Sequence, residues 1–262
     1  MDDVICVEPH FPKSVRYIIT TGSCHYIGFV DESTVLKYPH IKGPSPALDV
    51  EHTIFKHLGK HPRIIEFKGK HEDGLLLEYA TSGSLENYIQ GRDITKEEKL
   101  RLARETAEGV AYAHGKNVII CDINVRNVLL DAELHVKLCD FQGRLLGSDG
   151  RVICDGGASE NAESFMPRHD KDFADVQTDI FALGSTIYHI ITGHRPFPEL
   201  HTIDDEAVFT YRFRGGQFPY LQEEEEGGNI IRKCWENRYS SASEVVDDLI
   251  MLQESLPTSG RE

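Results

Sequence analysis

Closely spaced cysteine pairs, which hold zinc or carry out thiol–disulfide exchange, are missing from this chain. Its six cysteines stand at positions 6, 24, 121, 139, 154 and 234. Disulfide scaffolds are short and cysteine-dense, and structural zinc sites draw on paired ligands. We therefore expect reduced, packed thiols rather than a disulfide framework or a structural zinc site.

The sequence also lacks a long apolar run. Its most apolar stretch, residues 180–191, is interrupted by polar side chains and is too short to cross about 30 Å of hydrocarbon. The opening residues MDDVICVEPHFPK are acidic and contain no basic segment before an apolar run, so they do not predict a signal peptide. We expect a soluble protein of the cytoplasm or the nucleus.

Basic residues are few relative to acidic ones. Lys and Arg total 28 against 43 Asp and Glu, which gives a formal net charge of −15. Such a chain repels phosphate backbones and anionic lipid headgroups, so we expect no nucleic-acid partner and no membrane association. A local basic site for a nucleotide is still compatible with this charge.

The composition that is present is that of a globular protein, with 40% hydrophobic and 27% charged residues. A chain of 262 residues predicts one large domain or two closely packed lobes. We find no internal repeat.

Short β-branched and aromatic segments separated by turns dominate residues 15–80. The segments VRYIIT, YIGFV, STVLKY, IIEFKGK and GLLLEYA predict strands, several of them joined by hairpins. Apolar residues at helical spacing between positions 48 and 58 predict one helix, which Gly59 and Pro62 end. We therefore predict a small antiparallel β-sheet lobe that carries one helix.

After residue 80 the pattern becomes mainly helical. Helices are predicted over residues 85–89, 97–114, 179–192, 204–214, 227–237 and 242–254, and the segments VLLD and HVKLCD predict two short strands. Residues 143–164 are glycine-rich and are expected to be irregular. The fold class is therefore α+β and bilobal, with residues 81–254 as a larger helical lobe, 1–14 as a lead-in and 255–262 as a flexible tail.

Candidate residues for phosphoryl transfer occur in the first lobe. This chemistry needs a cation on the phosphates, a divalent metal held by oxygen ligands, and a base near the acceptor hydroxyl. Lys37 ends the strand STVLKY, and Glu51 lies on the following helix, where it could orient the ammonium group. Taken alone, each residue is better explained as a solvated side chain.

Three further polar residues flank the two short strands of the second lobe. Asp122 and Asn127 precede the strand VLL, and Asp140 ends the strand VKLCDF. Local turn hydrogen bonds are the ordinary explanation for loop Asp and Asn residues. Gathered at one end of a short hairpin, however, two carboxylates and an amide offer the oxygen ligands that Mg²⁺ prefers.

The ordered set of these motifs resembles a eukaryotic protein kinase domain over about residues 15–254. The family signature is a strand lysine, a helix glutamate, HRDxxxxN, DFG, APE and a later helix opened by aspartate. The chain carries TVLK, Glu51, ICDINVRN, DFQ, MPR and TDIFALGSTIYHIITGHRPF in that order. The sequence of these motifs is similar to that of a divergent, compact form of the domain found among short kinase-like proteins of fungi.

This resemblance implies the following roles. Asp122 would be the catalytic base, Lys37 would bind the α- and β-phosphates of ATP, and Glu51 would orient Lys37. Mg²⁺ would be held by Asn127 and Asp140, and Asp179 would brace the catalytic loop. The remaining ATP-binding positions would be Gly22, Gly28, Val30, Val35, Leu77, Glu78, Ala80 and Leu129, with Val30 and Val35 above the adenine and Leu129 below it.

Several positions depart from the family pattern. If Gly28 is the last glycine of the phosphate loop, Ser23 and His25 replace the others, and their side chains hinder close backbone approach to phosphates. Gln142 replaces the glycine of DFG, Cys121 replaces an arginine that receives an activation-loop phosphate, and Arg168 replaces the glutamate of APE.

Three functions therefore stay open. The first is an ATP- and Mg²⁺-dependent kinase acting on a protein hydroxyl, with serine or threonine favoured over tyrosine. The second is a pseudokinase that serves as a nucleotide-binding or scaffold module. The third, least favoured, is a small-molecule phosphotransferase.

Overall fold

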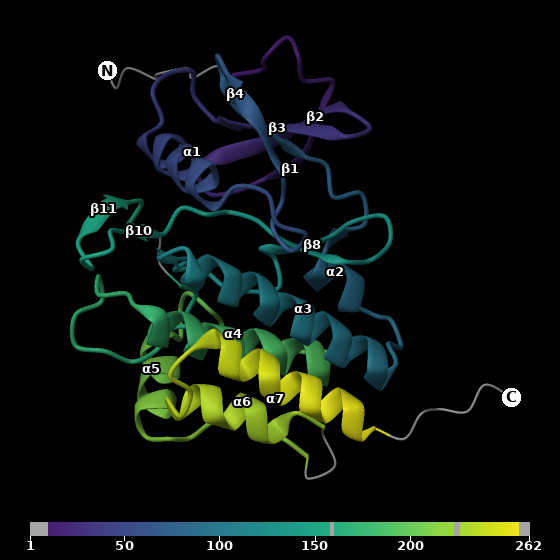
Figure 1. Ribbon diagram of the computed structural model, residues 1–262, viewed down its shortest axis with the longest axis vertical. Helices are drawn as coiled ribbons and strands as arrows, with labels where there is room; N and C mark the ends of the chain where they lie inside the picture. The colour runs from purple at the N-terminus through teal and green to yellow at the C-terminus, as the bar shows by residue number, and fades with distance from the viewer. Residues whose placement is uncertain (1–9, 158–159, 223–225, 257–262) are drawn as a thin grey trace, which may run out of the picture.

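A computed structural model describes residues 10–157, 160–222 and 226–256 of the chain. A five-stranded antiparallel sheet with one helix lies at one end of the molecule, and a larger, mainly helical part lies at the other (Figure 1). The predicted α+β, bilobal fold is therefore confirmed. Residues 1–9 of the expected lead-in and 257–262 of the expected tail lie outside the described residues.

The sheet has the order β1-β2-β3-β5-β4, and each strand pairs antiparallel to its neighbours. Its strands are β1 (Tyr17–Thr21), β2 (His25–Asp31), β3 (Thr34–Pro39), β4 (Phe67–His71) and β5 (Gly74–Glu78). The β2–β3 turn is tight because Asp31 accepts hydrogen bonds from both the N–H and the hydroxyl of Ser33. Strand β3 lies at the centre of the sheet, which explains why its side chains are almost all buried.

Helix α1 (Pro46–Leu58) packs beside the sheet (Figure 1). Ser45 caps its N-terminus, Pro46 occupies the first turn, where a missing N–H costs nothing, and Gly59 ends it at a φ of 68°. The helix buries one face toward the core, and that face contains a charged residue, Glu51.

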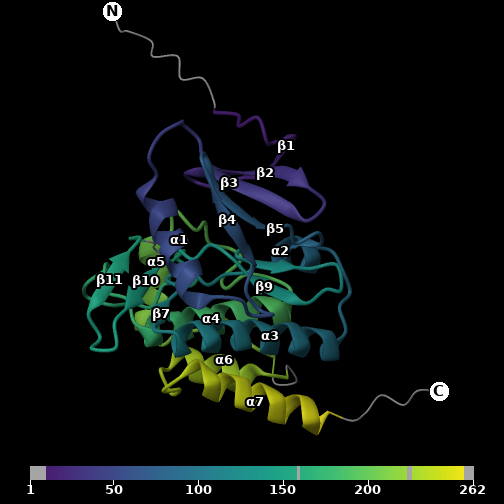
Figure 2. The ribbon, with the colours of Figure 1, turned by 45° about the horizontal axis from the view of Figure 1, so that its top comes forward.

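The helical part is built around α4 (Val176–Thr192), which is buried over most of its length. It lies between α3 (Lys96–Gly115) and α6 (Gly228–Trp235), while α7 (Ala242–Ser255) covers the outer side of α3 (Figure 2). The remaining helices are α2 (Leu85–Ile89) and α5 (Glu206–Arg214). No helix within the described residues combines the length and apolar character that crossing a bilayer requires.

Two small three-stranded sheets join the lobes. One has the order β6-β8-β9 and the other β11-β10-β7. Their strands are β6 (Gly83–Ser84), β7 (Val118–Ile119), β8 (Val128–Leu130), β9 (Val136–Leu138), β10 (Arg144–Leu146) and β11 (Val152–Asp155). The β10–β11 hairpin falls within residues 143–164, where we expected irregular chain, so that expectation is wrong for this part.

The pleat of β2 sends Gly28 and Val30 to the side of the sheet that faces away from the helical lobe. On that side Val30 packs against a separate apolar cluster formed by Val15, Leu36 and Tyr38. Ile27 instead pairs with Lys37 and belongs to the main core. Successive residues of a strand point to opposite faces, which separates Gly28 from Ile27. The register shifts between Phe29 and Asp31, and the packing of Val30 against this cluster shows which side it takes.

This packing predicts the effect of a side chain at Gly28. A Cβ there would lie 2.6 Å from Cγ1 of Val15 and 3.1 Å from Cε1 of Tyr38. We expect Gly28→Ala to lower the free energy of unfolding by about 1–3 kcal/mol because the core is overpacked. Chemical denaturation should show the change, whereas Gly22→Ala, whose Cβ meets only the His25 carbonyl at 3.4 Å, should leave stability unchanged. Equal stability of Gly28→Ala and the wild type would contradict this packing.

Candidate active site

The side chain of Lys37 joins three separate elements of the structure. Its Nζ lies 2.7 Å from Oε2 of Glu51 on α1 and 2.6 Å from Oδ1 of Asp140, which follows β9. Lys37 is only 6% exposed and Glu51 is fully buried. The structure therefore brings together the lysine, the helix glutamate and the aspartate that were selected from the sequence.

Electrostatics keep this lysine charged. Burial by itself would lower the pKa of Lys37, but the neighbouring carboxylates of Glu51 and Asp140 outweigh it, and the pKa is raised above its ordinary value. A buried ammonium group without such partners would lose its proton. The ammonium group of Lys37 therefore remains positively charged.

Asp122 lies in the loop between β7 and β8, where two asparagines hold its carboxylate. Asn127 donates from Nδ2 to Oδ2 at 2.9 Å and to the Asp122 carbonyl at 2.9 Å, and Asn124 donates to Oδ1 at 2.7 Å. Burial raises the pKa of Asp122 to about 6, and the charge of Asp140 adds to the rise. A carboxylate with a pKa near neutrality is suited to accept a proton.

Asp179, on α4, supports this loop from below. Its carboxylate accepts hydrogen bonds from the N–H of Ile120 at 2.7 Å and of Cys121 at 2.9 Å, and His114 lies 2.9 Å from it. Cys121 has a φ of 66°, a left-handed conformation that a residue with a side chain adopts only when its surroundings enforce it. The buried carboxylate supplies that constraint.

The donor set around Asp140 suits a hard divalent cation. The N–H of Cys139 donates to the Asn127 carbonyl at 3.0 Å, which holds the end of β9 beside the Asp122–Asn127 loop. The charge of Asp140 raises the pKa of Asp122, so the two carboxylates are near enough to interact electrostatically. Carboxylate and amide oxygens with no soft ligand among them fit Mg²⁺.

Several residues next to the β5–β6 connection are apolar. Val35 lies opposite Leu77 in the β3–β5 pair, and both are buried. Leu129, half-buried in β8, belongs to the same core cluster. Glu78 uses its carboxylate to pair with Lys137 at 3.2 Å, and Ala80 follows at the start of the connection between the lobes.

The segment predicted to be the phosphate loop has a different register from the one expected. Gly28 and Val30 are not brought together with Val35 and Lys37, because the pleat turns them to the opposite face. Ile27 lies on the cleft face instead. Aligning GxGxxGxV on Ile27 places Gly22 in the second glycine position, at the turn between β1 and β2, and His25 in the third. The strand alternation in YIGFV was the sequence signal that identifies this register.

His25 is buried at the start of β2. Its Nε2 lies 3.0 Å from Oγ of Ser45, the cap of α1, which links the start of β2 to the helix of Glu51. Burial and the charge of Lys37 lower the pKa of His25 to about 4, so the ring is neutral at pH 7. The sequence identified this residue only as a replaced glycine.

An apolar stack connects the two lobes beside these polar groups. Phe55 of α1 stacks on Phe67 of β4 with ring centroids 5.9 Å apart and meets Phe141 edge-to-face at 5.5 Å. Phe141 directly follows Asp140. Packing of this ring therefore fixes the backbone that carries the Asp140 carboxylate.

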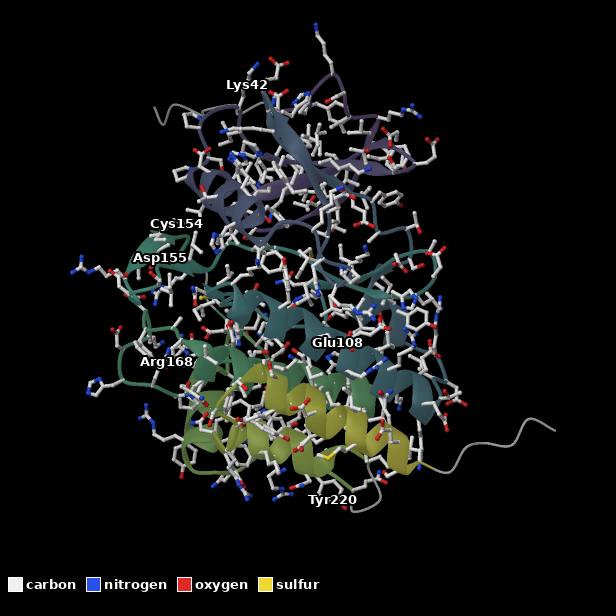
Figure 3. All side chains as sticks on the ribbon, in the orientation of Figure 1. Lys42, Glu108, Cys154, Asp155, Arg168 and Tyr220 are labelled. Atoms are coloured by element: carbon white, nitrogen blue, oxygen red, sulfur yellow. The ribbon has the colours of Figure 1, made fainter. Side chains whose placement is uncertain are left out.

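The segment after β11 is fixed by an ion pair that the sequence did not predict. Arg168, which replaces the glutamate of APE, lies 2.9 Å from Oε2 of Glu160, and both side chains are almost fully buried. Arg144 pairs with Asp155 at 2.8 Å. Arg168 and Asp155 lie along the same flank of the molecule (Figure 3). The reversed charge at position 168 was the available signal, since it requires an acidic partner.

Comparison with known proteins agrees with this geometry. The family described as the protein kinase domain matches residues 36–250. Mitogen-activated protein kinase kinase kinase 1 of Arabidopsis thaliana is 30% identical over 169 residues, which are 63% of this chain and 27% of that protein. Serine/threonine-protein kinase RUNKEL of the same plant is 30% identical over 148 residues, 54% of this chain and 11% of that protein. This chain therefore spans about a quarter or less of the length of these relatives, and it belongs to the protein kinase domain family.

Proposed function

We propose that the chain is an ATP- and Mg²⁺-dependent protein kinase that transfers the γ-phosphate to a serine or threonine hydroxyl. The observation that carries this proposal is the complete set of polar residues, in which Lys37 contacts both Glu51 and Asp140, and Asp122 is bonded to Asn127. The relative RUNKEL is named a serine/threonine-protein kinase, which supports the choice of acceptor.

ATP binding would use both sides of the cleft. Val35, Leu77 and Leu129 offer apolar surfaces for the adenine, and the main chain of Glu78 and Ala80 lies beside them. Lys37, held by Glu51, presents its ammonium group to the phosphates. A cation that is already oriented loses little conformational freedom when the nucleotide arrives.

Asp140 and Asn127 would hold the metal. Bound Mg²⁺ supplies positive charge to the phosphate oxygens, where negative charge accumulates during transfer. Asp140 brings a formal negative charge to the site and Asn127 a neutral oxygen, while Phe141 keeps the Asp140 backbone in place.

Asp122 would act on the acceptor. Its ionised carboxylate accepts the proton of the substrate hydroxyl as the oxygen bonds to the γ-phosphorus, and ADP leaves with the electrons of the broken P–O bond. Asn124 and Asn127 keep the carboxylate in one orientation, so the base does not rotate away from the hydroxyl.

The alternative function, a pseudokinase that binds nucleotide or a partner, is favoured by His25. Its buried ring occupies the third glycine position beside Lys37, and such a ring reduces the room for close contact between backbone and phosphate. A module that binds without transfer would retain the same fold.

A phosphate-transfer assay with the variant Asp122→Asn separates these functions. With radiolabelled ATP, Mg²⁺ and a peptide library, we expect the wild type to label serine or threonine peptides and the variant to be slower by about 10²–10⁴, because a positioned base is lost. Nucleotide binding, followed by thermal shift, should be retained. Asp247→Asn, an exposed residue of α7, is the matched control and should be as fast as the wild type. Binding without transfer by the wild type would favour the pseudokinase.

The pKa of Asp122 predicts the acid side of the pH profile. The base must be ionised, and its pKa is raised to about 6, so kcat/KM should fall as the pH drops below about 6 and level off above it. An aspartate with its ordinary pKa near 4 would keep full activity at pH 5. Rates measured from pH 4.5 to 8 test this. The residual activity of Asp122→Asn should lack this dependence, and a wild-type profile that is flat down to pH 5 would contradict the assignment.

Activity should not depend on phosphorylation of residues 143–164. The arginine that usually receives the phosphate is Cys121 here, Ser164 is 2% exposed, and the Glu160–Arg168 ion pair already fixes the segment. We expect phosphatase treatment, and alanine at Ser148, Ser159 (outside the described residues) and Ser164, to leave turnover unchanged. A large loss of turnover after both serine treatments, in folded protein, would show a phosphate-dependent segment.

The variant Glu160→Gln should lower the free energy of unfolding by about 3–5 kcal/mol, since it leaves the charge of a buried arginine unpaired.

A further inference from the structure

Gln142, which replaces the glycine of DFG, lies directly against the carboxylate of Asp140. Its Nε2 donates to Oδ1 of Asp140 at 2.7 Å. Its backbone N–H also donates to the Asp140 carbonyl, at 3.0 Å. Two hydrogen bonds thus join residue 142 to the same aspartate, one to the backbone and one to the side chain.

Asp140 needs such support because of its backbone conformation. Its φ is 63°, which is uncommon for a residue other than glycine and requires constraint by its surroundings. The bond from the Gln142 N–H to the Asp140 carbonyl closes a three-residue turn around Phe141. The ring of Phe141 is fully buried, so the middle of this turn is fixed as well.

The backbone near Gln142 makes close contacts that two glycines permit. A Cβ at Gly156 would lie 1.9 Å from the Gln142 carbonyl oxygen, and one at Gly143 would lie 2.0 Å from the Ile119 carbonyl oxygen. The N–H of Gly156 donates to the Gly143 carbonyl at 3.0 Å. These close contacts require glycine at positions 143 and 156, and they pack the backbone of residues 142 and 143 against neighbouring chain.

The two oxygens of the Asp140 carboxylate have different surroundings. Oδ1 accepts from both Lys37, at 2.6 Å, and Gln142, at 2.7 Å. Oδ2 accepts no hydrogen bond from any part of the chain that the structure describes, which leaves it open for a cation. Gln142 thus holds Oδ1 independently of Lys37, whose ammonium group is also proposed to contact the phosphates.

We infer that Gln142 is a positioning residue for metal binding, which orients the Asp140 carboxylate so that Oδ2 faces the metal. The inference rests on the proposed function, because the metal is the one that accompanies ATP. Gln142 would then support metal binding, whereas the loss of the DFG glycine, seen in the sequence alone, favoured the pseudokinase hypothesis. The side chain acts through Asp140 and contacts no substrate.

The test is a Mg²⁺ titration at a saturating concentration of the ATP analogue AMP-PNP, followed by thermal shift. Gln142→Met keeps the length of the side chain but removes the donor. Gln142→Gly restores the family residue and serves if the methionine variant does not fold. The control is Gln90→Met, at an exposed glutamine that ends α2.

We expect both Gln142 variants to need about tenfold more Mg²⁺ for half-maximal stabilisation, the effect of losing one hydrogen bond to a charged group. AMP-PNP binding in EDTA and the melting temperature without ligand should stay close to those of the wild type and of Gln90→Met. A Mg²⁺ requirement equal to that of the wild type would overturn the inference. So would equal losses with Mg²⁺ and with EDTA, which indicate a merely structural role.

The same experiment separates this inference from the proposed function. If the wild type binds AMP-PNP with a clear Mg²⁺ dependence, the proposed nucleotide and metal site stands, and only the Gln142 variants decide the inference. If the wild type shows no Mg²⁺-dependent binding, the proposed function fails and the inference fails with it.

Discussion

The buried charge of Lys37 is the constraint on which the arrangement of the two lobes depends. Removing an ammonium group from water costs several kcal/mol unless carboxylates replace the lost solvation. Glu51 comes from α1 and Asp140 from the chain after β9, so the sheet, the helix and the second lobe must all be in place before the charge is satisfied. A charge that requires three elements at once favours one arrangement over other compact ones.

A second buried charge, that of Asp179, likewise requires separate elements of the helical lobe to be in place. Asp179 sits at the first turn of α4, and its carboxylate accepts backbone N–H groups from the loop that carries Asp122. The phenylalanine stack of Phe55, Phe67 and Phe141 joins α1 and β4 to the residue that follows Asp140. Apolar packing thus transmits the position of α1 to the backbone of Asp140, while each charged centre fixes one side of the cleft.

Much of this architecture is readable in the sequence. The strands over residues 17–39, helix α1 and the long helices follow from apolar periodicity and from capping residues such as Ser45 and Gly59. The polar residues of the cleft also follow, because their spacing relative to two short strands sets their chemistry. The sequence did not establish that these residues lie close together in space, since the spacing of residues along strands does not specify tertiary contacts.

Three features could not be derived in this way. The register of the phosphate loop was misread because Gly28 satisfies a glycine pattern, although its real role is to admit Val15 and Tyr38. The Glu160–Arg168 pair joins residues whose charges are ordinary until burial is known. The hydrogen bond from Gln142 to Asp140 depends on a left-handed backbone, which no local pattern specifies.

The β10–β11 hairpin has a rigid base and an open tip. At the base, Gly143 and Gly156 lie so close to neighbouring carbonyl groups that no larger residue fits. At the tip, residues 147–150 form an exposed turn that Gly150 ends at a φ of 77°. Insertions and deletions in evolution can therefore accumulate at the tip without altering the cleft, whereas the two basal glycines should resist replacement in any descendant that keeps this fold.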